Sequence, residues 1–289
     1  MKIENKILGA AMLLGTLLPL AGAQAQDVKL KCMSWNVKAL ELRANTNVTR
    51  DITRFAKAIR EEDPDIVCFN EFETASGTMG SKEKLTEFAE ALGMFPFFIW
   101  SYDKDNGYYG NGILSKYPIV NSKSELLGMF TGADQRSVGW ADILVPTGAD
   151  QRSAGWADIL VPTDSKPEGV KVRIVCTHLD AFGGDETCYE QAKEVIAYAV
   201  APATEAGIPS LLMGDMNCGP GTDAIKEYQA YGTKLCNNDG TFGGYSKLDY
   251  FISFPQGKWS CSDYKVVKGD RLNVISDHYP IAGTAVLKN

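Results

Sequence analysis

The stretch SLLMGDMN at residues 210–217 joins an apolar run to an abrupt polar end. Leu211, Leu212 and Met213 are long apolar side chains of the kind that fill a buried β-strand. Asp215 and Asn217 come shortly after this apolar run in the sequence. A carboxylate and a carboxamide therefore stand where a strand ends, and we expect them to face a cleft rather than the core.

The same pattern, an apolar strand that ends in a carboxylate, amide or imidazole, recurs in Trp35-Asn36, Asn70-Glu71, Thr177-His178-Leu179-Asp180, Leu248-Asp249-Tyr250 and Ser276-Asp277-His278. Both histidines of the chain belong to these clusters. A single strand-end Asp or Asn is usually a turn or cap residue. Six clusters that use both histidines favour one shared site, because strand ends at one edge of paired sheets converge.

The chemistry of such a cleft follows from its side chains. It is rich in hard oxygen ligands and poor in thiolates, which suits Mg²⁺, with Mn²⁺ or Ca²⁺ as alternatives, better than zinc. A hard cation, carboxylates, two imidazoles and amides suit in-line attack of activated water on a phosphate ester. The sequence therefore indicates a metal-dependent phosphoesterase.

Apolar, β-rich runs outnumber amphipathic helical segments and do not alternate with them strictly. We predict strands at 29–37, 65–72, 112–120, 171–180, 210–217, 248–254, 260–267 and 281–287. We predict helices at 49–62, 81–92, 185–201 and 222–231. This pattern predicts an α/β fold in which two sheets pack face to face with helices outside, as a single domain over residues 26–289.

Seven segments resemble the endonuclease/exonuclease/phosphatase superfamily and follow its order along the chain. They are SWNV at 34–37, DIVCFNE at 65–71, NGILSKYPI at 111–119, THLD at 177–180, GDMN at 214–217, KLDYF at 247–251 and SDHYP at 276–280. The resemblance, which is to members such as deoxyribonuclease I and exonuclease III, implies a four-layer α/β/β/α sandwich with the cleft at one rim.

The resemblance also implies a role for each site residue. Glu71 would bind the metal, with Asn36 and Asp277 beside it. His278, oriented by Asp249, would be the general base, although Asp215 takes that role in some mechanisms proposed for the family. His178 and Asn217 would hold the phosphate.

Several functions are compatible with these motifs. We expect a phosphodiesterase, with a nuclease favoured and a sphingomyelinase-type lipid headgroup esterase as an alternative. A phosphomonoesterase acting on inositol phosphates would need further cations, for which the candidates near the motifs are Lys104, Lys116, Lys247 and Arg271. A non-catalytic binding module should lack a catalytic group, and the set here is complete.

Two departures from the family pattern stand out. The residue before Glu71 is Asn70 where the family often has Gln. Residues 131–146 and 147–162 form a tandem repeat that differs only at Val138 and Ala154. The repeat offers both Arg136-Ser137 and Arg152-Ser153 for one Arg-Ser strand. We expect the second copy to form it, because that copy is continuous with the predicted strand at 171–180.

The first 25 residues are typical of a signal peptide, with Lys2 and Lys6 before an apolar stretch and a cleavage motif that ends at Ala25. We expect a periplasmic or extracellular protein, the alternative being a membrane anchor. The net charge is −7, and the leader contributes +1 through Lys2, Glu4 and Lys6, so the mature chain carries −8. Such a charge disfavours tight, non-specific DNA binding. We expect a monomer without a membrane span.

Seven cysteines remain after cleavage of the leader. Cys32, Cys68 and Cys176 lie in apolar runs and are expected in the core. The absence of a CxxC pair argues against zinc. One disulfide among Cys188, Cys218, Cys236 and Cys261 is compatible with an oxidising compartment.

Overall fold

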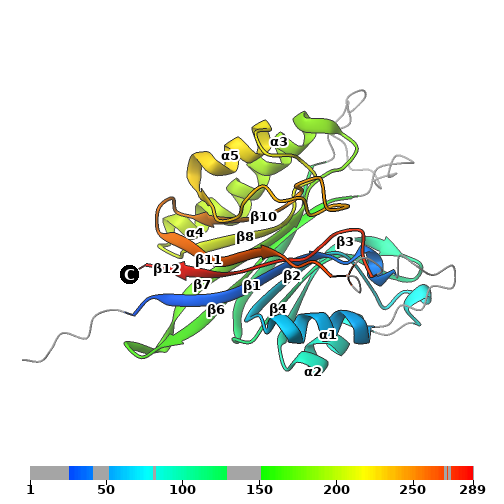
Figure 1. Cartoon of the computed structure of the whole chain (residues 1–289), viewed down its shortest axis with the longest axis horizontal. Coiled ribbons are helices and arrows are strands. Elements are labelled where there is room, and N and C mark those ends of the chain that lie inside the picture. The colour runs from blue at the N-terminus through cyan, green and yellow to red at the C-terminus, as the bar shows by residue number, and fades with distance from the viewer. Residues whose placement is uncertain are drawn as a thin grey trace, which may run out of the picture.

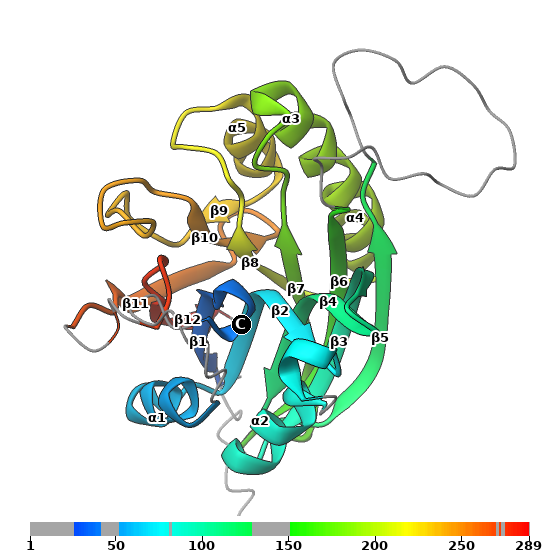
Figure 2. The same cartoon turned by 90° about the vertical axis from the view of Figure 1, so that its right-hand side faces the viewer.

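Two six-stranded sheets stacked face to face form the centre of the protein. The computed structural model describes residues 26–41, 52–80, 83–128, 151–269, 272 and 275–288. One sheet has the order β11-β12-β1-β2-β4-β3 and the other β5-β6-β7-β8-β10-β9. Helices α1 and α2 cover the first sheet and α3 and α5 cover the second (Figure 1, Figure 2). The predicted four-layer α/β/β/α sandwich is confirmed.

The bounds of the elements are as follows. The first sheet contains β1 (Val28–Asn36), β2 (Ile66–Thr74), β3 (Phe95–Lys104), β4 (Gly107–Ser115), β11 (Trp259–Val266) and β12 (Ile281–Leu287). The second contains β5 (Ile119–Leu126), β6 (Ser153–Thr163), β7 (Lys166–His178), β8 (Ser210–Asp215), β9 (Thr233–Lys234) and β10 (Asp249–Phe254). The α-helices are α1 (Ile52–Glu62), α2 (Lys84–Leu92), α3 (Gly184–Val195), α4 (Ala201–Glu205) and α5 (Asp223–Tyr231).

Apolar side chains fill the spaces between the layers. Leu30, Cys68, Ile174 and Leu212 are among the buried residues where the sheets and the α3–α5 layer meet. A second cluster under α1 and α2 contains aromatic rings in tilted contact, including Trp35, Phe55, Phe69 and Phe88. The cysteines expected in the core, Cys32, Cys68 and Cys176, are buried.

Two strand predictions need correction. Residues 112–120 are not one strand, because the turn at Lys116–Pro118 ends β4 and starts β5 in the opposite sheet. Strand β3 was not predicted, and its Pro96 obscures the pattern. A proline is tolerated there because β3 is an edge strand, where an N–H is not needed for pairing.

The predicted helix at 185–201 is longer than expected. It continues from α3 through the π-helical segment η3 (Ile196–Val200) into α4, and so ends at Glu205. Among the helices described, none is long and apolar enough to cross a membrane.

The second repeat copy supplies β6, which pairs with β5 and β7. Its buried Ala154 lies opposite Thr177, the residue before His178. The first repeat copy and the leader fall outside the described residues.

Candidate active site

Strand register brings the predicted site residues to one rim of the sandwich. Strands β1 and β2 are parallel, and Asn36, the last residue of β1, lies opposite Asn70. Strands β7 and β8 are also parallel, and His178 lies opposite Asp215. Asp249 begins the antiparallel strand β10 on the other side of Asp215. Asp215 thus has His178 and Asp249 as its two neighbours across the sheet.

Three polar residues of the site adopt the left-handed backbone conformation that usually favours glycine. They are Lys38 (φ 45°), Glu71 (φ 51°) and Asn217 (φ 48°). Glu71 lies in a bulge where the β2–β4 register shifts between Phe69 and Phe72. A bulge re-aims the side chain it carries, so Glu71 leaves the regular in-and-out alternation. Such strain clusters at functional sites.

Gly214 permits the close approach of β8 to β7. Its φ is 149°, and a Cβ at this position would lie 2.0 Å from the carbonyl oxygen of Thr177. No other residue fits without moving the backbone. This glycine therefore sets the spacing between Asp215 and His178.

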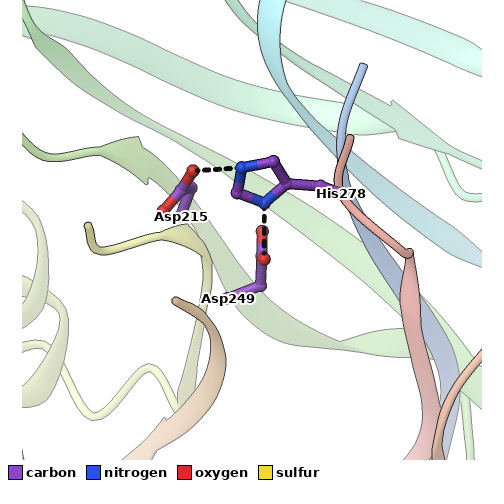
Figure 3. A group of neighbouring side chains, drawn as sticks. All are labelled: Asp215, Asp249 and His278. Atoms are coloured by element: carbon purple, nitrogen blue, oxygen red, sulfur yellow. Dashed lines mark hydrogen bonds and ion pairs between the residues drawn. The ribbon is translucent and has the colours of Figure 1, made fainter. Parts of the chain in front are cut away.

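His278 lies between two carboxylates (Figure 3). Its Nδ1 is 2.9 Å from Asp249 Oδ2, and its Nε2 is 3.5 Å from Asp215 Oδ2. Burial alone would lower the pKa of His278, but these carboxylates outweigh it and raise the pKa to about 10. Burial raises the pKa of Asp215 to about 7. The charge of His278 opposes this shift, and the charge of Asp249 adds to it.

The backbone around His278 is held firmly. Ser276 Oγ accepts a hydrogen bond from His278 N and donates to the carbonyl oxygen of Asn36. Trp35 Nε1 donates to the carbonyl oxygen of His278, and the Phe242 ring lies 5.0 Å from the imidazole, centroid to centroid. The imidazole is therefore fixed before any ligand arrives.

His178 lies on the other side of Asp215, with 3.6 Å between Nε2 and Asp215 Oδ2. Arg152 Nη1 approaches His178 Nδ1 to 2.9 Å, and Asn217 Nδ2 approaches Nε2 to 2.9 Å. Burial and then the Arg152 charge hold the pKa of His178 well below its usual value. Because Arg can only donate, its contact favours a neutral imidazole.

Glu71 is tied to the inner residues through Asn36. Asn36 Nδ2 donates to Glu71 Oε1 at 2.8 Å and to Asp215 Oδ2 at 3.0 Å. Tyr109 donates its hydroxyl to Glu71 Oε2 at 3.1 Å. Burial, together with the Glu71 charge, raises the pKa of Tyr109 well above its usual value, so the phenol stays a donor.

Asp277 is held at the rim by a lysine. Lys38 Nζ lies 2.7 Å from Asp277 Oδ2, and both side chains are partly exposed. Lys38 belongs to the left-handed turn η1 (Lys38–Leu40), whose first N–H donates to Asn36 Oδ1. The turn thus connects the Asn36 amide to Asp277.

Two buried amides join the sheets beneath the site. Asn70 accepts from Asp215 N and donates to the carbonyl oxygen of Thr177 and to Asn111 Oδ1. Asn111 in turn donates to the carbonyl oxygen of Ser153. The departure from Gln at position 70 is therefore accommodated, because the shorter amide still reaches both sheets.

The donor set fits a hard divalent cation. Carboxylate and amide oxygens surround the site. Among the described residues no thiol lies with them, and Asp249 Oδ1 is a buried carboxylate oxygen without a hydrogen-bond partner. Ligand atoms of Asp215, Asp249 and His278 all lie within 4.8 Å of one another and could hold an ion. The predicted metal residues are arranged differently. Asn36 contacts Glu71 directly, whereas Asp277 joins them through Lys38.

The structure brings together all the predicted catalytic residues, which are His178, Asp215, Asn217, Asp249 and His278. It also shows site residues that sequence reasoning did not single out for the centre, namely Lys38, Tyr109 and Asn111. An amide within the apolar run at 111–114 was the one available signal for Asn111. Arg152 was expected in the Arg-Ser strand of the second repeat copy, but not beside His178.

Solved structures of other proteins share this fold. The human Nocturnin catalytic domain, solved with bound sulfate, superposes with a TM-score of 0.66 at 16% identity over 91% of this chain and 97% of that one. A mannosyl-6-phosphatase from Bacteroides thetaiotaomicron VPI-5482 gives a TM-score of 0.62 at 19% identity, over 89% of this chain and 100% of that one. An endonuclease/exonuclease/phosphatase from Beutenbergia cavernae DSM 12333 gives a TM-score of 0.65 at 19% identity, over 90% of this chain and 72% of that one.

These identities show a common fold and no more. Comparison with curated proteins gave no match. The sequence profile of the endonuclease/exonuclease/phosphatase family matches residues 33–278, which include every predicted site residue. The chain therefore belongs to the endonuclease/exonuclease/phosphatase family.

Proposed function

We propose that this protein is an exported, Mg²⁺-dependent phosphodiesterase that cleaves its substrate by in-line attack of water. The observation that carries the proposal is the array Asp249–His278–Asp215, joined to Glu71 through Asn36. It combines groups that move protons with groups that hold a cation, within one rim of the fold. Both kinds of group promote the hydrolysis of a phosphate ester.

We assign the general base to Asp215. Its Oδ2 atom is the central atom of the site, within 3.6 Å of Asn36 Nδ2, His178 Nε2 and His278 Nε2. Both nitrogens of His278 already face carboxylates, so this imidazole suits a positive charge that stabilises the phosphoryl oxygens. Asp249 keeps the ring in that orientation.

The phosphate would lie against His178, Asn217 and Arg152. Arg152 is buried, and its Nε has no hydrogen-bond partner within the part of the chain that the structure describes. A buried guanidinium with an unused donor is suited to a phosphate oxygen. Glu71, Asn36 and Asp277 would hold Mg²⁺, which when bound neutralises charge on the phosphoryl group.

The cations of the chain favour a diester over a highly charged monoester. Lys104 pairs with Glu73, Lys116 with Asp63 and Asp65, and Lys247 donates to the Tyr264 hydroxyl. Arg271 falls outside the described residues. Three of the four candidate cations for a phosphomonoester pocket therefore have other partners.

Exposed aromatic rings favour a nucleic acid among the diesters. Tyr245 is 78% exposed, and its ring contacts Phe242, which packs on His278. Phe182, four residues after His178, is 73% exposed. Such rings can stack with unpaired bases at about 1–3 kcal/mol each. The net charge of −7 favours short or single-stranded substrates over long duplexes.

A panel of substrates tests this proposal. Purified protein with Mg²⁺ would be assayed on single-stranded DNA, RNA, sphingomyelin vesicles and inositol phosphates, with EDTA and the His278→Ala variant as controls. We expect EDTA-sensitive cleavage of a nucleic acid. Phosphate release from inositol phosphates without diester cleavage would overturn the diesterase assignment, and no turnover of any ester would overturn the enzyme assignment.

Export is tested separately. Protein secreted by the native leader should begin at Gln26. An intact N-terminus on membrane-bound protein would support the anchor alternative.

A further inference from the structure

Both oxygens of the Glu71 carboxylate accept a hydrogen bond from a neutral donor. Asn36 Nδ2 donates to Oε1 at 2.8 Å, and the Tyr109 hydroxyl donates to Oε2 at 3.1 Å. The two donors lie on β1 and β4, the strands on either side of β2 in the sheet. We propose that Tyr109 is a positioning residue that fixes the Glu71 carboxylate for the divalent cation. This inference rests on the proposed function, in which Glu71 binds Mg²⁺.

The Glu71 side chain needs support from outside its own strand. Glu71 lies in a β-bulge with a left-handed backbone, so the regular alternation of β2 does not set its direction. Its side chain is also partly exposed. A strained residue of this kind stays in place only where its surroundings hold it. Asn36 supplies one such contact, and Tyr109 supplies the other.

The Tyr109 ring is itself fixed by the two neighbouring strands. Tyr109 lies opposite Glu73 on β2 and opposite Tyr102 on β3. The rings of Tyr102 and Tyr109 stack, with 5.0 Å between their centroids and 27° between their planes. Lys104 Nζ lies 4.6 Å from the centroid of the Tyr109 ring and 3.1 Å from the buried Glu73 Oε2. These contacts leave the phenol little freedom to turn away from Glu71.

The chemical type of the donor decides its effect on a cation site. A phenol or an amide holds a carboxylate without cancelling its negative charge, and each carboxylate oxygen keeps a further lone pair for a metal. Groups that hydrogen-bond to a metal ligand in this way orient that ligand for the ion. In contrast, Lys38 holds Asp277 with a positive charge that opposes a cation. Tyr109 therefore suits a ligand that must stay negative.

Mg²⁺ binding to Tyr109→Phe tests the proposal. This change removes the hydroxyl and keeps the ring that contacts Tyr102 and Lys104. Isothermal titration of the mature chain should show Mg²⁺ affinity lowered about tenfold, as expected for loss of a group that orients a metal ligand. The matched control is Tyr108→Phe, which changes the adjacent, 48% exposed tyrosine and should bind Mg²⁺ as the wild type does. Equal affinity in Tyr109→Phe and wild type would overturn the positioning role.

Thermal unfolding distinguishes positioning from packing without any assay of activity. A ligand that binds the folded state raises the Tm, and the rise grows with affinity. We therefore expect the rise in Tm on adding Mg²⁺ to be smaller in Tyr109→Phe than in the wild type. A fall in Tm that is equal in EDTA and in Mg²⁺ would mean that Tyr109 only packs, and would contradict the proposal.

Glu71→Gln separates this inference from the proposed function. It should weaken Mg²⁺ binding at least as much as Tyr109→Phe, because it removes the charge of the ligand itself. Unchanged binding in Glu71→Gln would overturn the proposed cation site. Weaker binding in Glu71→Gln with wild-type binding in Tyr109→Phe would overturn the positioning role alone. The double variant should bind Mg²⁺ no more weakly than Glu71→Gln, because Tyr109 acts through Glu71.

Discussion

The active site has a buried part and an open part, and the two differ in how they are held. The inner group lies at most 5% exposed and consists of His178, Asp215, Asp249 and His278. The rim group is partly exposed and consists of Lys38, Glu71 and Asp277. Inner residues contact one another directly, whereas the rim carboxylates are held by Asn36, Tyr109 and the Lys38 ammonium.

This difference suggests a division of labour. Protons can be moved within the inner group without contact with bulk water, because donors and acceptors are already aligned. A cation that exchanges with solution needs carboxylates it can reach, and the rim supplies them. Asn36 is the one side chain that bonds to both groups among the described contacts. Each prediction below asks whether the two groups are in fact separable.

The largest effect is expected in the inner group. Asp215→Asn and His278→Ala should each lower kcat by about 10³- to 10⁴-fold, because each removes a group that handles protons or phosphoryl charge. The Mg²⁺ concentration that gives half-maximal activity should stay the same. Steady-state kinetics across a Mg²⁺ titration measure both. A large shift in that concentration would show that Asp215 or His278 binds the cation, as their geometry with Asp249 allows.

The next effect is expected at the rim. Glu71→Gln should lower activity about 10²- to 10³-fold at low Mg²⁺ and recover part of it at high Mg²⁺, because a charged ligand is lost. Glu125→Gln, an exposed carboxylate paired with Lys123, serves as the control and should behave as wild type. If no Mg²⁺ concentration restored activity to Glu71→Gln, the assignment of cation binding to the rim group would be contradicted.

A third prediction concerns pH and the stability of the metal-free protein. The pKa of His278 is raised to about 10 and that of Asp215 to about 7, so the folded state binds more protons than the unfolded state. The contribution of these two groups to folding stability should therefore fall as pH rises, whereas His178, whose pKa is lowered, contributes the opposite slope below about pH 6.5. The Asp215 part is lost between about pH 4 and 7, and the His278 part between about pH 6.5 and 10.

Denaturant unfolding in EDTA from pH 5 to 9 measures this slope. Between pH 5 and 9 the free energy of unfolding should fall by about 2 kcal/mol more in the wild type than in Asp249→Asn. The reason is that the Asp249 charge is the main cause that raises the His278 pKa. The control Asp223→Asn changes an exposed carboxylate of α5 and should follow the wild type. Equal slopes in wild type and Asp249→Asn would contradict the ion pair.

The smallest effect is expected at Lys38. Lys38→Met should tighten Mg²⁺ binding two- to fivefold, because the ammonium no longer competes for Asp277 in a partly exposed pair. Lys226→Met, which loses only an exposed pair on α5, should leave it unchanged. Isothermal titration with Mg²⁺ gives the affinities. Weaker binding in Lys38→Met would mean that Lys38 positions the rim instead of competing for it.

The sequence was most informative where short-range pattern decides geometry. An apolar run followed by Asp215, or by His178, predicts a strand that ends in a polar residue, and parallel pairing then brings such ends together. Arg152 and Tyr109 could not be placed in this way, because their positions depend on β6 pairing with β7 and β4 with β2. The turn Lys116–Pro118 was misread because a short break between apolar runs does not show that the chain changes sheets.

Sequence pattern also missed how the rim is assembled. The contact of Lys38 with Asp277 joins residues 239 positions apart and depends on a left-handed turn. Likewise, the direction of Glu71 comes from a bulge and not from its place in the alternation. Neither feature has a signature in the residues themselves.

The left-handed backbone at Lys38, Glu71 and Asn217 has a consequence for directed evolution. A glycine would relieve about 1–2 kcal/mol of conformational cost at Lys38 or Glu71, and less at Asn217 because asparagine tolerates this conformation, so a library selected only for thermal resistance should accumulate glycine there. The same library selected for turnover should reject it. Positions where the two selections disagree would then map the active site from sequencing counts alone, without a substrate being known in advance.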